Sequence, residues 1–82
     1  MPHLYRNIVA AMKDKDYRIV VGKNISRIRK KANLTVKELG YMCDMEHSNL
    51  IPIEKGRINV TIDTLSKIAN ALNVDLKDFF ES

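Results

Sequence analysis

Apolar residues recur every three or four positions along most of this chain of 82 residues, and this spacing predicts α-helices. Polar segments that contain helix-capping residues interrupt the pattern and divide residues 17–81 into five helices. The predicted fold class is therefore all-α. The expected helices are about Tyr17–Lys31, for which Asp16 is a candidate cap, Val36–Cys43 and His47–Glu54. A fourth runs from its cap Thr61 to its end at Asn73, and a short last one runs from its cap Asp75 through Phe80.

Residues 1–16 carry a further apolar stripe at helical spacing. Pro2 stands where the first turn of a helix tolerates proline. An extra N-terminal helix is expected there, so the chain divides into a helical extension, 1–16, and one domain, 17–82. The extension either covers the domain's own core or forms a dimer contact, and the shortness of the stripe favours the first. The stripe consists of Leu4, Tyr5, Ile8, Val9 and Met12.

The segment 34–56 contains two short predicted helices separated by a tight turn. Thr35 can cap the first helix while Glu38, three residues later, reaches back to the cap, which is the spacing of a capping box. The apolar face of this helix is expected to consist of Leu39, Met42 and Cys43. In the helix that follows Thr61, the stripe expected to be buried consists of Ile62, Leu65, Ile68, Ala69 and Leu72.

The second of these helices has Leu50 and Ile53 on its inward face and ends at Gly56. A short helix, a turn of about three or four residues and a second short helix form a helix-turn-helix, whose second helix lies in the major groove of DNA. The side chains left on its outward face are His47, Ser48, Ile51 and Pro52.

Basic residues are concentrated in one part of the chain. The net charge is +4 overall, but it is +6 over residues 1–57 and −2 over residues 58–82. From Arg18 to Lys37 there are seven basic residues and no acidic ones. This distribution is expected of a surface that faces phosphate groups.

From about Val20 to Phe80 the chain resembles the Cro/phage-repressor (Xre-like) type of helix-turn-helix regulator. The resemblance rests on the segments GKNISRIRKKANLT, KEL, LIPIEKGRIN and TIDTLSKIANALNVDLKDFF. It implies a compact five-helix repressor-like domain that acts as a homodimer on double-stranded DNA, as a sequence-specific transcriptional regulator expected to be a repressor. It also implies an ion pair between Arg29 and Glu54, the glutamate that ends the recognition helix.

The resemblance and the side-chain chemistry together assign roles at the DNA. The recognition helix, about 47–54, would read base edges with His47 and Ser48 as polar readers. Ile51 and Pro52 could offer only apolar contact, most simply to thymine methyl groups. Contacts with the DNA backbone are expected from Val36 (through its N–H), Lys37, Asn49, Lys55, Arg57 and Asn59.

Three residues depart from the family pattern. Val36 stands where glutamine often holds a phosphate, and Glu46 is a weak helix cap whose charge a phosphate would repel. Pro52 lies inside the recognition helix, where proline removes a hydrogen bond to the Ser48 carbonyl and costs about 3 kcal/mol. Either the helix kinks at Pro52, or it begins late, near Ser48 or Asn49, so that Pro52 falls in its first turn.

These departures support an alternative function, a protein-interaction module such as an antitoxin or anti-regulator with weak DNA binding. In that case Ile51 and Pro52 would contact a protein partner. The basic segment 18–37 favours DNA instead. Dimers are expected to form through the C-terminal helix, where Phe79 and Phe80 are hard to bury together, through the N-terminal segment, or through both.

The sequence contains no pattern for catalysis or for a cofactor. His3 and His47 are far apart, and no CxxC or HExxH motif occurs, so neither a metal nor an enzymatic activity is expected. Cys43, where the family usually has alanine, is expected to be a small core residue. A single cysteine suits a reducing cytoplasm, and no membrane-spanning run or signal peptide is evident, so a bacterial or phage-like cytoplasmic protein, at the nucleoid when bound, is expected.

Overall fold

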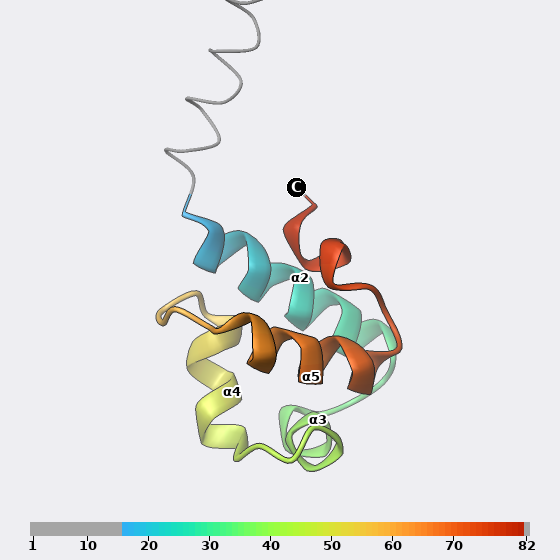
Figure 1. The fold of residues 1–82 in the computed structure, drawn as a ribbon. Helices are drawn as coiled ribbons and strands as arrows, with labels where there is room; N and C mark the ends of the chain where they lie inside the picture. The colour runs from blue at the N-terminus through green and yellow to red at the C-terminus, as the bar shows by residue number, and fades with distance from the viewer. Residues whose placement is uncertain (1–15, 82) are drawn as a thin grey trace, which may run out of the picture.

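The computed structural model describes residues 16–81, and all regular structure in this range is helical (Figure 1). Four α-helices are followed by a short 3₁₀ helix, which confirms the predicted all-α class. Apart from Asp16, the N-terminal helix expected over residues 1–16 lies outside the described residues. The helices are α2 (Tyr17–Lys31), α3 (Val36–Met42), α4 (His47–Glu54), α5 (Ile62–Leu72) and η1 (Leu76–Phe80).

The last helix differs from the prediction, because Leu76–Phe80 is a 3₁₀ helix and not a fifth α-helix. Five residues are too few for a run of i→i+4 hydrogen bonds, and 3₁₀ geometry is common in such short pieces. Asp75 and Asp78 form a capping box at its start, in which the Asp75 N–H donates to Asp78 Oδ2 at 3.1 Å.

Polar side chains fix the helix ends where the sequence predicted them. The Arg18 N–H donates to Asp16 Oδ1 at 3.1 Å at the start of α2, and the Thr64 N–H donates to Thr61 Oγ1 at 3.1 Å at the start of α5. Asn73 ends α5 with a φ of 57°, the left-handed conformation that asparagine tolerates after a helix.

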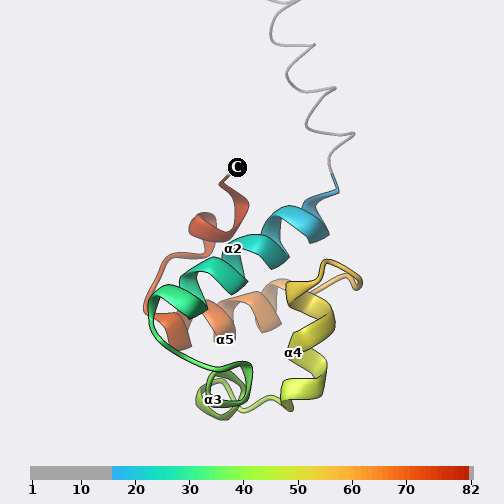
Figure 2. The same ribbon diagram turned by 180° about the vertical axis from the view of Figure 1, so that it is seen from behind.

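The helices enclose one core, to which every one of them contributes. α3 and α4 lie together at one end of the domain, and η1 lies at the other end (Figures 1 and 2). The fully or almost fully buried apolar residues are Val21, Ile25, Leu39, Cys43, Leu50, Ile53, Leu65, Ile68, Ala69 and Phe79.

Two apolar residues that were expected on buried faces are exposed instead. Met42 is 51% exposed and Ile62 is 59% exposed. Met42 is the last residue of α3 and Ile62 is the first residue of α5. The neighbouring helices cover the middle of each apolar stripe but not these terminal residues.

A buried amide that the sequence did not indicate joins α2 to the C-terminal part of the domain. Asn24, on α2, is 8% exposed, and its Nδ2 donates to the carbonyl oxygens of Phe79 at 2.8 Å and Glu81 at 2.6 Å. These bonds hold η1 and the residues after it against α2.

Candidate nucleic-acid interface

A buried ion pair fixes the end of α4 against α2. Arg29 Nε lies 2.7 Å from Glu54 Oε2, and Arg29 Nη2 donates to Glu54 Oε1 at 3.0 Å. The third guanidinium nitrogen, Nη1, donates to the Leu34 carbonyl at 2.7 Å. The two charged side chains are only 10% and 8% exposed. The expected pair is therefore present, and it also holds the turn between α2 and α3.

Gly22 allows the backbones of α2 and α4 to approach closely. A Cβ atom at this position would lie 2.5 Å from the carbonyl oxygens of both Ile53 and Glu54. No larger residue fits without moving one helix, so glycine here sets the position of α4 relative to α2.

The turn between α3 and α4 consists of the four residues Cys43–Glu46. Asp44 takes up the change of direction with a φ of 56°. The Met45 N–H then donates back to the Gly40 carbonyl at 2.8 Å, and a Cβ on Gly40 would lie 2.6 Å from the Met45 oxygen. This turn brings α4 across α3 in the arrangement that the sequence predicted.

Helix α4 has one buried and one exposed face. Leu50 and Ile53 are 0% and 4% exposed, whereas Ile51 is 38% exposed. Pro52, predicted to face outward, is half-buried. The residues at the start of the helix that are exposed, as predicted, are His47, Ser48 and Asn49.

The start of α4 decides between the two predictions made for Pro52. The helix begins at His47, so a late start near Ser48 or Asn49 is wrong, and Pro52 lies in the helix interior. Glu46 precedes the helix and makes no side-chain capping bond, as expected of a weak cap.

By contrast, α3 begins with the complete capping box. The Glu38 N–H donates to Thr35 Oγ1 at 3.0 Å, and the Thr35 N–H donates to Glu38 Oε1 at 2.9 Å. The pKa of the Glu38 carboxyl lies below its ordinary value. The larger cause is the hydrogen bond from the Thr35 backbone, and the smaller one is the interaction with the Thr35 side chain. Val36 is half-buried and Lys37 is exposed in the first turn.

The expected backbone-contacting residues fall on two surfaces. Lys37 lines a depression between α3 and α4, which it shares with the predicted base reader His47, and Lys55 and Arg57 are exposed directly after α4. Gly56 between them is buried, with a φ of 71° that only glycine adopts readily.

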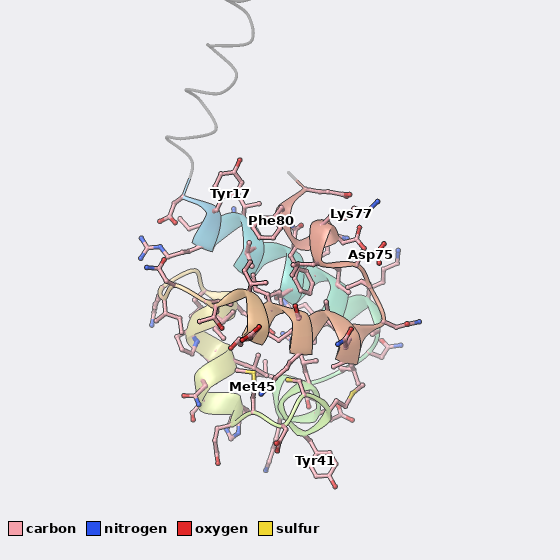
Figure 3. All side chains as sticks on the ribbon, in the orientation of Figure 1. Tyr17, Tyr41, Met45, Asp75, Lys77 and Phe80 are labelled. Carbon is pink, nitrogen blue, oxygen red and sulfur yellow. The ribbon has the colours of Figure 1, made fainter. Side chains whose placement is uncertain are left out.

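Asn59, expected at the DNA backbone, is exposed and lines an apolar groove of about 220 Å³ beside Tyr17, Ile62 and Phe80. The centroids of the Tyr17 and Phe80 rings lie 6.3 Å apart at this groove. Figure 3 labels both side chains, near the η1 end of the domain. This surface was not predicted, because Ile62 was assigned to the buried stripe of its helix and Ile58, which is 42% exposed, was assigned no role.

Other chemistry finds no support in the described part of the chain. Between residues 16 and 81 no group of three or more His, Cys, Asp or Glu side chains is placed to hold a metal ion. Cys43 is a free, buried thiol, and burial raises its pKa, which disfavours the reactive thiolate. Within the same range, no helix has the length and apolar character needed to cross a membrane.

The sequence of this chain is similar to those of known regulators. A family model described as helix-turn-helix matches residues 25–79. The control protein C.BamHI of Bacillus amyloliquefaciens is 34% identical over 65 residues, which are 78% of this chain and 80% of that protein. The immunity repressor protein of Bacillus phage phi105 is 34% identical over 58 residues, 71% of this chain and 40% of the repressor.

A solved structure shares the fold. The restriction-modification controller protein C.AhdI from Aeromonas hydrophila superposes with a TM-score of 0.74 over 77% of this chain and 91% of that chain. The sequences are 22% identical, so this likeness concerns the fold alone.

Proposed function

Because this chain belongs to the helix-turn-helix family of Xre- and Cro/C1-type DNA-binding transcriptional regulators, we propose that it represses transcription by binding a specific double-stranded DNA sequence as a homodimer. In this proposal α4 enters the major groove. The family is not a family of enzymes, and the proposed activity consists of binding alone.

The observation that carries the proposal is the division of α4 into a fixed face and a free face. Leu50, Ile53 and the Arg29–Glu54 pair hold the helix to the core. The opposite face leaves His47, Ser48 and Ile51 exposed to a docking surface. A rigid helix with exposed polar and apolar side chains can read base edges.

Phosphate contacts would position this helix. Lys55 and Arg57 are exposed directly after α4 and supply charge, while Lys37 lies across the depression from His47. The side-chain amide of Asn49 adds a neutral hydrogen bond. The Val36 N–H adds another, since the first N–H groups of a helix have no partner within it. Asn59 has the weakest support among the proposed contacts, because it lines the apolar groove.

The apolar groove supports the proposed homodimer. Ile62 and Phe80 are 59% and 38% exposed beside Tyr17, and a second copy would remove this apolar area from water. Half-sites lie about 34 Å apart, so two copies must meet outside the face that contacts DNA. Sedimentation should detect a dimer, and a monomer both free and on a duplex would contradict this assembly.

The proposal is tested by selecting bound duplexes from a random pool and measuring affinity at several salt concentrations. Lys55→Gln and Arg57→Gln should each lower the affinity for all duplexes alike. Each should also reduce the slope of log affinity against log salt concentration by about one unit. Lys67→Gln, on the exposed surface of α5, is the matched control and should leave the slope unchanged. Equal slopes for all variants would contradict the assignment of Lys55 and Arg57.

A protein-interaction module is the second candidate. Tyr41 and Met42 on α3 are 91% and 51% exposed, and Tyr41 projects from the end of the domain in Figure 3. The half-burial of Pro52 weakens the Ile51/Pro52 surface first considered for a protein. Failure of the pool to yield any preferred duplex would favour this candidate over DNA binding.

A further inference from the structure

Helix α2 carries a row of positive charge that the proposed function does not use. Lys23, Arg27 and Lys30 follow one another at intervals of four and three residues, a spacing that places them on one side of the helix. All three side chains are exposed, and together they line a depression that Ser26 and Glu54 complete. These three basic residues form the basic stripe. None of them is among the residues predicted to contact the DNA backbone, all of which follow α2 in the chain.

No carboxylate in residues 16–81 forms an ion pair with the basic stripe, since both ion pairs in this range join other residues. Glu54 borders the depression, but both of its oxygens accept hydrogen bonds from Arg29. Arg27 Nη2 donates to a neutral acceptor, Asn24 Oδ1, at 3.3 Å. The stripe therefore presents three positive charges that lack a paired counter-charge within the described domain.

The basic stripe adjoins the surface proposed to contact DNA. Glu54 ends α4 and borders the depression, and Lys55, a proposed phosphate contact, follows it directly. Figure 2 shows α2 and α4 on the near side of the domain, with α5 behind them. Residues 58–81, which include α5 and η1, carry two basic and four acidic residues. Positive charge thus continues from the end of α4 onto α2 and not onto α5, which favours DNA over an acidic protein as the partner of the stripe.

The length of the basic stripe matches a short run of DNA backbone. Lys30 follows Lys23 by seven residues, which correspond to about 10 Å along an α-helix. One strand of DNA carries a phosphate about every 3.4 Å along the duplex axis, so a run of this length carries about three. We propose that the basic stripe binds the phosphate backbone of the duplex outside the base pairs that α4 contacts. It adds affinity for flanking DNA without adding sequence preference. This inference rests on the proposed DNA binding.

The first test removes equal charge from two surfaces. Lys23→Gln with Lys30→Gln, the stripe variant, removes two exposed lysines of α2, and Lys67→Gln with Lys77→Gln, the control variant, removes two exposed lysines of α5 and η1. Affinity is measured on the preferred duplex extended by about 10 base pairs, one helical turn, on each side. The stripe variant should reduce the slope of log affinity against log salt concentration about twice as much as Lys55→Gln alone. The control variant should keep the slope of the unaltered protein, and equal slopes in the two double variants would overturn the inference.

The second test locates the contact on the DNA. The unaltered protein should bind the flanked duplex at about 50 mM salt about tenfold more tightly than the duplex without flanks, the factor that one phosphate contact contributes relative to about 1 M salt. The stripe variant should bind the two duplexes alike. Replacing single flanking phosphates by uncharged methylphosphonates should weaken the unaltered protein and not the stripe variant. Flanks that leave the affinity of the unaltered protein unchanged would overturn the inference while leaving DNA binding itself intact.

The remaining outcomes separate the inference from the proposed function. If the stripe variant binds every duplex as the unaltered protein does, the stripe serves another partner, such as an acidic protein, and the inference is wrong. If the random pool yields no preferred duplex, the proposed function fails, and the inference fails with it. Thermal melting checks that both double variants fold, and the comparison of flanked and unflanked duplexes on the unaltered protein stands independently of them.

Discussion

The two helices of the motif, α3 and α4, are stabilised at their ends in different ways. Thr35 and Glu38 cap the start of α3 with two reciprocal hydrogen bonds formed entirely within the segment. Helix α4 begins at Glu46, which makes no side-chain cap, and it contains Pro52 in its interior. Its end is fixed by Arg29, which is 25 residues away.

The start of α3 is thus stabilised locally, whereas the end of α4 is stabilised by a tertiary contact. Helix α3 carries its own start signal, whereas α4 depends on packing and on a distant ion pair, as most helices in proteins depend on tertiary contacts. A helix held in this way can change the residues of its exposed face without losing its position. Substitutions on the exposed face of α4 should therefore leave the placement of the helix unchanged.

The largest effect is expected from breaking the tertiary support of α4. Arg29→Ala leaves Glu54 buried without a partner, and removing one member of a buried pair costs about 3–5 kcal/mol. For a domain of this size the melting temperature should fall by more than about 10 °C.

Arg18→Ala is the control for this experiment. It removes the pair with Asp16, whose side chains are 44% and 38% exposed, and the melting temperature should be nearly unchanged. Equal melting temperatures for the Arg29→Ala and Arg18→Ala variants would show that the buried pair does not hold α4.

A smaller effect is expected from breaking the local support of α3. Thr35→Ala removes the side chain that accepts the Glu38 N–H and should lower the free energy of unfolding by about 1 kcal/mol. Glu46→Ala is the matched change at the start of α4 and should have no measurable effect, because that side chain caps nothing. Urea titration of both variants measures the difference, and equal losses would show that the two starts are equivalent.

The smallest effect is expected from pH. The pKa of Glu38 in the folded protein lies below its ordinary value of 4.5, so its contribution is complete above that value and is lost as pH falls through the folded pKa. Glu38→Gln keeps the box geometry without a titrating group. Its stability should therefore decline less steeply on acidification than that of the unaltered protein. Urea unfolding at several values from about pH 6 to pH 3 measures the stability of both proteins. The same loss of stability in both would show that the carboxylate charge contributes nothing.

Helix boundaries were predictable because capping is local chemistry. Asp16, Thr35 and Thr61 accept bonds from N–H groups two or three residues away, and Asn73 ends α5 by its own backbone conformation. The roles assigned to residues at the DNA stay predictions.

Burial at helix ends was less predictable. Periodicity identifies which face of a helix is apolar, but not how far the neighbouring elements extend along it, so Met42 and Ile62 were assigned to the core and are exposed. The buried amide of Asn24 could not be foreseen either. Its two acceptors are the carbonyl groups of Phe79 and Glu81, which lie 55 and 57 residues further along the chain.

The bonds from Asn24 also have a consequence for how the protein is made. Asn24 and Phe79 are separated by 55 residues, and Phe79 fills the core beside α2. At a synthesis rate of about 5–20 residues per second, roughly 3–11 seconds pass between the addition of the two residues. During that interval the Asn24 amide on α2 lacks these two carbonyl acceptors, and the Phe79 ring is not yet there to cover the apolar face of α2. Closure of η1 against α2 thus requires the chain to have been synthesised through Glu81, whose carbonyl also accepts a bond from Asn24.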